Sequence, residues 1–131
     1  MKTQITPAQA ENALDAIQKI KVKSLNSPAG YALAKNTMVL NRVLKDFVKF
    51  REAAKADAYP DNEKVDPSSQ KHAELTQLVM AKGHAPVDVD VHQMKMSQLF
   101  AVAVIEDISV ITSLDFILVD DIELDAAIKS E

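Results

Sequence analysis

The chain has 131 residues, of which 47% are apolar and 26% are charged, a composition that suits one globular domain with its own core. It contains no cysteine, which excludes disulfides and thiolate metal sites. The net charge of −4 is unevenly divided: residues 1–58 carry ten Lys or Arg and five Asp or Glu, whereas residues 59–131 carry five and fourteen. Such a chain either packs its own halves together or self-associates head to tail.

The N-terminal segment lacks the apolar run of a signal peptide, so we expect no secretion by that route. The stretch ITPAQAENALDAIQKIKVK predicts a first helix. Thr6 can cap it, Pro7 suits its first position and Gln9 completes a capping box. An apolar face follows at helical spacing, made of Ala10, Ala13, Leu14, Ile17 and Ile20.

A second, long helix is predicted from Ser27 and Pro28 over about residues 28–57. Its aromatic residues Tyr31, Phe47 and Phe50 are expected in the core. The short link between the two helices favours an antiparallel hairpin. At 1.5 Å per residue the second helix spans about 45 Å, so part of it should protrude or pack on another subunit. We therefore expect a homo-oligomer or a protein partner.

The stretch AYPDNEKVDPSSQ predicts a loop over about residues 59–70, because it combines two prolines with several turn-forming residues. Asp66 with Pro67 is expected to begin a third helix that carries Leu75, Leu78 and Val79 and ends near Gly83.

From Pro86 onward the pattern changes to a period of two. The stretch PVDVDVHQM alternates valine with acidic residues and histidine, which predicts a half-buried strand. Ser97 is expected to cap a short helical turn at SQLFA.

Residues 99–119, LFAVAVIEDISVITSLDFILV, are apolar but carry three acids, and each central acid costs roughly 2.5–3.5 kcal/mol to insert into a bilayer. We therefore expect a buried segment and no membrane span. Its β-branched residues favour strands, whereas Asp107 can cap a helix with Ile108, Ile111, Leu114 and Leu118 on one side. Length and capping favour the helix.

These elements predict a mostly α (α+β) fold, with a single domain over residues 1–131. An N-terminal antiparallel helical hairpin with a long second helix occupies residues 1–58, followed by the loop at 59–70. Residues 71–131 form a mixed α/β part, with a small C-terminal strand and helix element and an acidic tail.

Two carboxylates and an imidazole share one face of the predicted strand: Asp88, Asp90 and His92. Such groups can hold a divalent cation. Same-face neighbours on a strand nevertheless lie about 7 Å apart, which is wide for three ligands of one ion. We interpret them as a solvated strand face, and we predict no metal, no cofactor and no catalytic residue.

A basic helix face, with Lys35, Arg42, Lys45 and Lys49, is the second candidate surface. Nucleic-acid phosphates would suit it. The chain is acidic overall, however, and the acids Asp46 and Glu52 interrupt the stripe. The sequence therefore argues against direct nucleic-acid binding and favours a solvated helix face.

In the order of its features, the chain resembles a family of small, uncharacterised tailed-phage proteins. The resemblance rests on YALAKNTMVL leading into a charged helix with Arg51, a Pro/Asp-rich loop, a short helix, the strand in VDVDVHQMKMSQL and a closing ISVITSLDFILVDD. It implies a phage or prophage origin, and a location in the host cytoplasm or the virion. It also implies a role either in virion assembly or in interference with the host. No catalytic motif is carried over from it.

We therefore predict a non-enzymatic interaction protein that works by covering a partner's surface. One version inhibits a bacterial defence system, using an acidic surface that imitates nucleic acid. The acids of this surface are Asp88, Asp90, Asp120, Asp121, Glu123 and Asp125. The alternative is a virion structural or assembly protein. A further alternative is a small-ligand or metal-binding protein, which needs a pocket that the sequence does not show.

Overall fold

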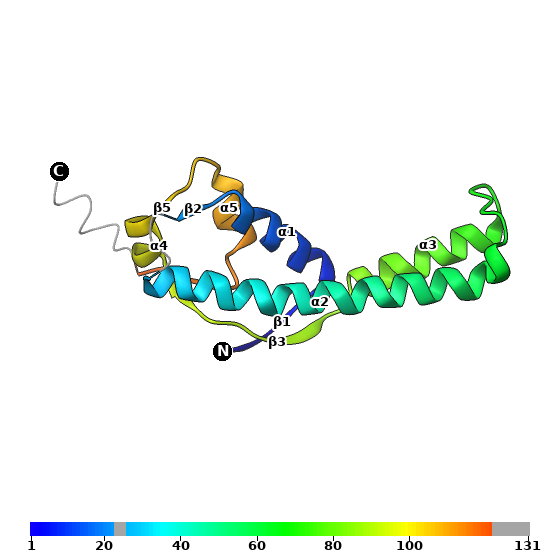
Figure 1. Cartoon of the computed structure of the whole chain (residues 1–131), viewed down its shortest axis with the longest axis horizontal. Helices are drawn as coiled ribbons and strands as arrows, with labels where there is room; N and C mark the ends of the chain where they lie inside the picture. The colour runs from blue at the N-terminus through cyan, green and yellow to red at the C-terminus, as the bar shows by residue number, and fades with distance from the viewer. Residues whose placement is uncertain (23–25, 122–131) are drawn as a thin grey trace.

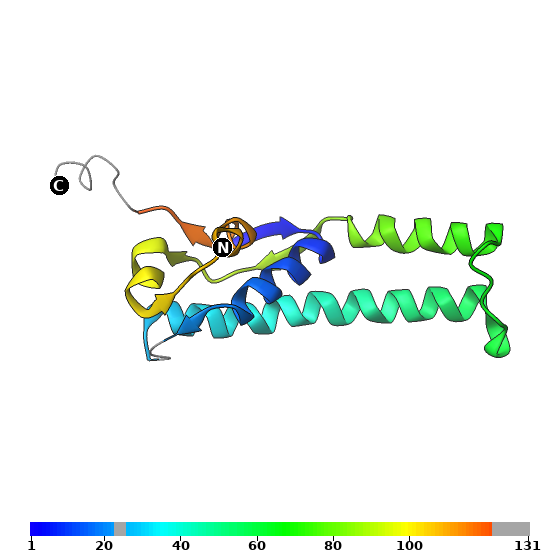
Figure 2. The ribbon, with the colours of Figure 1, turned by 90° about the horizontal axis from the view of Figure 1, so that it is seen from above.

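A single long helix, α2 (Pro28–Ala58), is the axis of the molecule in the computed structural model, which describes residues 1–22 and 26–121. Figures 1 and 2 show that the N-terminal half of α2 lies in a compact body, together with most other elements. The C-terminal half of α2 leaves this body and pairs with α3 (Gln70–Gly83) in a two-helix arm. The expectation that part of the long helix protrudes is therefore confirmed.

Helix α1 (Pro7–Gln18) begins as the sequence indicates. Thr6 is its N-cap: the Gln9 backbone N–H donates to the Thr6 hydroxyl at 3.1 Å, and the Thr6 N–H donates to the Gln9 side chain at 2.8 Å. This capping box satisfies two backbone donors that the first turn leaves unpaired. Helix α1 then crosses α2 in the opposite direction (Figure 2), which confirms the predicted hairpin.

The first helix ends earlier than predicted. It stops at Gln18, and Lys21–Val22 form a short strand, β2, that pairs antiparallel with β5 (Ala103–Val104). Ile20 is buried, but it lies after the helix. β-Branched Val22 suits a strand, and the partner that holds this segment extended lies far along the chain. The predicted helical face therefore lacks its last member.

Helix α3 begins at Gln70 with Ser69 as its N-cap, so the prediction of a start at Asp66 and Pro67 was wrong. The Asp66 carboxylate instead accepts hydrogen bonds from the backbone N–H and the hydroxyl of Ser68, at 3.1 and 2.7 Å, which closes a turn before the helix. The connection from α2 also contains a 3₁₀ turn, η1 (Pro60–Asn62), in which Asp61 is left-handed, with φ of 56°.

The strand predicted from the alternating valines is present as β3 (Val87–Asp90), but it ends before His92, which was predicted to share a strand face with Asp88 and Asp90. Its partner is β1 (Lys2–Ile5), which pairs antiparallel with it, Lys2 opposite Asp90 and Ile5 opposite Val87. A third pair is parallel and joins β4 (Met94–Lys95) to β6 (Leu118–Val119). The pairs β1–β3 and β2–β5 therefore join the N-terminal part of the chain to segments beyond residue 86. The pair β4–β6 joins the segment after β3 to the end of the described chain.

The helix predicted to begin after Asp107 is present, but it is short and does not reach Leu118. Residues 99–119 hold the end of α4 (Met96–Val102), then β5, α5 (Ile108–Ser113) and β6. Asp107 does cap α5 as predicted, accepting from the Ser109 N–H at 2.9 Å. Ile108 is 85% exposed, however, so the expected apolar face does not form. Ser97 is not the cap of α4, a position that Lys95 occupies.

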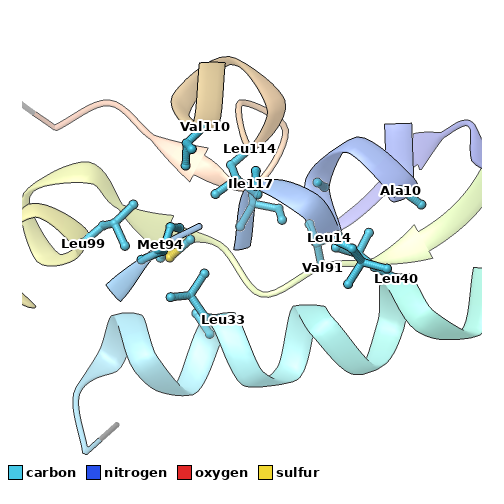
Figure 3. Close-up of a cluster of buried hydrophobic side chains, with 14 of the residues drawn as sticks. Ala10, Leu14, Leu33, Leu40, Val91, Met94, Leu99, Val110, Leu114 and Ile117 are labelled. Carbon is cyan, nitrogen blue, oxygen red and sulfur yellow. The ribbon is translucent and has the colours of Figure 1, made fainter. Parts of the chain in front are cut away.

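The core lies between α1, the first half of α2 and the C-terminal segments (Figure 3). Its most completely buried apolar side chains are Ile5, Leu40, Val91, Leu99, Val110, Leu114 and Ile117. One polar residue, Asn36, is buried among them. Its side-chain amide donates to the His92 carbonyl and its oxygen accepts from the His92 N–H, both at 2.8 Å. The core therefore belongs to the body and not to the arm.

None of the helices in the described ranges, 1–22 and 26–121, is long and apolar enough to cross a membrane.

Candidate functional site

The acids of strand β3 are exposed, as the sequence indicates, but they serve the protein's own fold. The Asp88 carboxylate accepts a hydrogen bond from the Gln4 side chain at 2.9 Å, across the β1–β3 pair. The Asp90 carboxylate pairs with the Met1 amine at 3.0 Å, and the hydrogen bond and charge of this amine lower the pKa of Asp90. Each of these two carboxylates therefore contributes to the pairing of β1 with β3 through one of its oxygens.

Asp120 and Asp121 directly follow strand β6, which belongs to a different ribbon, β4–β6. Asp121 accepts a hydrogen bond from the Ser97 hydroxyl and one from the Ser97 backbone N–H, the latter at 3.0 Å, so it holds the start of α4. Asp120 is exposed. Glu123 and Asp125 lie outside the described residues. The predicted acidic surface is thus divided between β3 and the segment after β6, and its described members have structural roles at Asp88, Asp90 and Asp121.

The hydrogen bonds from the Ser97 hydroxyl and backbone lower the pKa of Asp121 below its ordinary value of 3.8. A lowered pKa means that the ionised form stabilises the fold. This contribution is complete above pH 3.8 and is lost as the pH falls through the lower, folded pKa. We expect Asp121→Asn to lose less stability than the wild type between pH 5 and pH 2, as measured by urea unfolding. Asp115→Asn, at an exposed acid of the same region, should keep the wild-type dependence.

The predicted basic residues form one stripe along α2, in which Arg42, Lys45 and Lys49 are exposed and Lys35 is half-buried. Lys35, Arg42 and Lys49 recur at intervals of seven, and Lys45 lies beside them. Tyr31 was predicted in the core, but it is 57% exposed and stands at the start of this stripe, with the Lys35 ammonium 5.7 Å from its ring centroid. The prediction for Tyr31 was wrong because the seven-residue spacing that relates Tyr31 to Met38 and Lys45 places it on the charged side.

The described histidines do not form a metal centre. His92 meets the Tyr31 ring edge-on, with the ring centroids 6.0 Å apart. His72 Nδ1 lies 3.3 Å from the Tyr59 hydroxyl at the tip of the arm. Within residues 1–22 and 26–121, no three His, Asp or Glu side chains converge as metal ligands would.

An apolar groove runs along the arm between α2 and α3, with a volume of about 450 Å³. We call it the arm groove; its lining residues are Phe50, Ala53, Ala54, Asp57, Ala58, Lys71, Glu74, Leu75 and Leu78. The small alanines of α2 leave the space, and Leu75 and Leu78 of α3 form the facing wall. Leu78 is 51% exposed. The groove therefore has an apolar floor with charged residues towards its tip.

The arm is sparsely buried compared with the body. Gly83 is the one buried residue of α3. The aromatic residues of the arm are shielded by cations: Arg51 lies over Phe47, Lys71 over Tyr59 and Lys82 over Phe50, at 5.9, 4.8 and 5.4 Å from the ring centroids. Leu78 is covered less, at 51% exposed, whereas Leu75 is half-buried. Leu78 is therefore the large apolar side chain of the groove that a partner would cover most.

Sequence reasoning missed the arm groove because the groove depends on which part of α2 meets α3. The signal that was available is the spacing of Leu75 and Leu78 against Phe50 and the alanine pair Ala53 and Ala54. Two paired helices cover each other on one side only, so the apolar surface that α2 and α3 form together stays open to solvent.

Comparison of the chain with protein-family models, with curated proteins and with solved structures found no match in any of the three. The function is therefore inferred from the surfaces of the protein itself.

Proposed function

We propose that this is a non-enzymatic interaction protein that docks a helical surface of another protein chain in its arm groove. The observation that carries the proposal is the exposure of Leu78 in an apolar groove at the centre of a projecting arm. A groove between two helices accepts an amphipathic helix whose apolar residues recur every three or four positions.

The energetics support docking at this place. Covering a half-exposed leucine recovers part of the roughly 1.5–3 kcal/mol that complete burial of such a side chain contributes. The alanines Ala53 and Ala54 present little side-chain bulk, so a partner helix can come close to the backbone of α2. The charged residues Asp57, Lys71 and Glu74 then lie at the edge of the contact, where they orient a partner.

The arm groove is a better candidate than the acidic surface. Asp88, Asp90 and Asp121 already make contacts within the body, and they are divided between two separate ribbons. A partner in the groove covers apolar atoms that nothing else in the described part of the chain covers. The phage origin stays a prediction from the sequence, as does the choice between a host-defence inhibitor and a virion or assembly component.

The proposal is tested by photo-crosslinking in cells that produce the protein. A benzoylphenylalanine replaces Leu78 in one variant and Met80 in a matched control. Met80 is similarly exposed, at 58%, but it lies two positions further along α3, on a side turned away from the groove. We expect the probe at position 78 to form a defined adduct whose crosslinked peptide comes from a helix.

The probe at position 80 should give only diffuse background. Equal yields at the two positions, or no adduct at position 78, would contradict docking in the arm groove.

A further inference from the structure

We propose that the occupant of the arm groove is the arm groove of a second copy of this chain, so that two arms form a four-helix bundle. This inference rests on the proposed function and names the partner. Its basis is that the groove is complementary to itself, in both its apolar residues and its charges.

The charges of the groove follow a simple pattern near its tip. Helix α2 contributes the acid Asp57, and α3 contributes Lys71 on the facing wall. The Lys71 ammonium is already held at this end, 3.0 Å from the Glu63 carboxylate and over the Tyr59 ring. One wall of the groove therefore ends in an acid and the other in a lysine.

A two-fold axis along the arm brings α2 of each copy over α3 of the other. Lys71 of one copy then faces Asp57 of the second, and the same contact occurs twice because a two-fold interface repeats every pair. Phe50 of one copy faces Leu78 of the second in the same arrangement, and the alanines lie opposite Leu75. Opposite charges are thus matched at Lys71 and Asp57 and apolar residues further along the groove, while Glu74 comes level with Ala54 of the second copy.

The bodies limit how closely the arms approach. Figures 1 and 2 show β1 and β3 beside the base of the arm, where α3 ends. The two arms should therefore be closest near their tips and diverge towards the bodies, as helices of a bundle do when they cross at about 20°. The contact then extends from Lys71 and Asp57 near the tip to Phe50 and Leu78 at the other end of the groove.

The size of the surface sets the strength of the association. The 14 residues of α3 extend about 21 Å, and two helices side by side are about 20 Å wide. Two such faces bury on the order of 1,000 Å² in total, which is at the lower limit for specific interfaces. We therefore expect a reversible dimer with a dissociation constant in the micromolar range.

The test is the mass of the purified full chain by light scattering or analytical ultracentrifugation, from about 1 µM to about 500 µM. The wild type should rise from 14.4 kDa towards twice that mass. Leu78→Glu should stay at 14.4 kDa throughout, because it places a charge against the apolar ring of Phe50 of the second copy. Met80→Glu, equally exposed outside the groove, should behave as the wild type.

A charge exchange tests the arrangement as well as the occupant. In a dimer of the Asp57→Lys variant, the new lysine of each copy faces Lys71 of the other. In a dimer of the Lys71→Glu variant, the new glutamate of each copy faces Asp57 of the other. Each variant alone should therefore dimerise at least tenfold more weakly than the wild type. An equimolar mixture should restore the affinity, because both contacts are then between opposite charges. Circular dichroism of each variant establishes that its helices are intact. A mixture no tighter than the single variants would overturn the two-fold arrangement.

The two proposals fail in different ways. A wild type that stays at 14.4 kDa at the highest concentration, or a Leu78→Glu variant that dimerises equally well, overturns self-association through the groove. If the photo-reactive residue at position 78 then still captures a helix of a different protein, the docking function stands and only the identity of the occupant is wrong. If that probe captures nothing, both proposals are wrong.

Discussion

Replacing Leu40 with alanine is expected to lower the free energy of unfolding by about 3 kcal/mol, within the 2–5 kcal/mol range for a buried leucine. Leu40 is 0% exposed and lies beneath α1, close to Ala10 and Leu14 (Figure 3). Its truncation leaves a cavity that the two crossing helices can close only by moving closer together, which their other packed side chains resist. The measurement is urea unfolding followed by circular dichroism at about 1 µM, where self-association is weak.

The matched control is Leu78→Ala in the arm. The same chemical change at a half-exposed leucine should cost less than about 1 kcal/mol, because little buried contact is lost. If the two variants unfold at the same urea concentration, the division of the molecule into a packed body and a sparsely buried arm is wrong.

Asn36→Ala is expected to destabilise the body by about 2–4 kcal/mol, although it removes only three side-chain heavy atoms. Asn36 is 0% exposed and satisfies both backbone groups of His92 with hydrogen bonds of 2.8 Å. Alanine leaves a partly buried donor and acceptor without partners, and each such group costs about 1–3 kcal/mol. The melting temperature should fall by roughly 10 °C.

Asn41→Ala is the control for this variant, because Asn41 lies on the same helix and is exposed. It should change the stability by no more than about 0.5 kcal/mol. If Asn36→Ala lowers the free energy of unfolding no more than Asn41→Ala does, water replaces the hydrogen bonds of the Asn36 amide without a cost in stability, and the prediction is wrong.

Helix starts were predictable because their causes are local. Thr6, Pro7 and Gln9 lie within four positions of each other, and Ser27 precedes Pro28 directly, so the sequence alone contains the cap. The mostly α fold and the long second helix follow from such signals together with the apolar spacing. The start of α3 was less predictable, because Ser68 and Asp66 compete with Ser69 for the same turn.

Features that depend on distant partners could not be predicted. β1 has the sequence KTQI, which carries little strand signal, and it becomes a strand because β3 lies beside it. In the sequence, Asn36 does not differ from any other polar residue of a helix, because its buried hydrogen bonds are made with His92, which lies far along the chain. In residues 99–119 most positions are apolar and the polar ones follow no clear period, so the sequence does not distinguish helix from strand and tertiary pairing decides. The arm groove could not be predicted for the same reason, since it depends on how α3 packs along α2.

The two-stranded ribbons have a consequence for the order of folding. The two helical hairpins join segments that are close in the chain, so they close small loops and can form early. The pairs β1–β3 and β2–β5 join the first residues to segments beyond residue 86 and close most of the chain into a loop. Their formation should be the slow, late step, after synthesis has passed β5. Until these pairs form, the apolar side of α1 stays partly exposed to solvent, and the helical hairpins are present without the strands that complete the body.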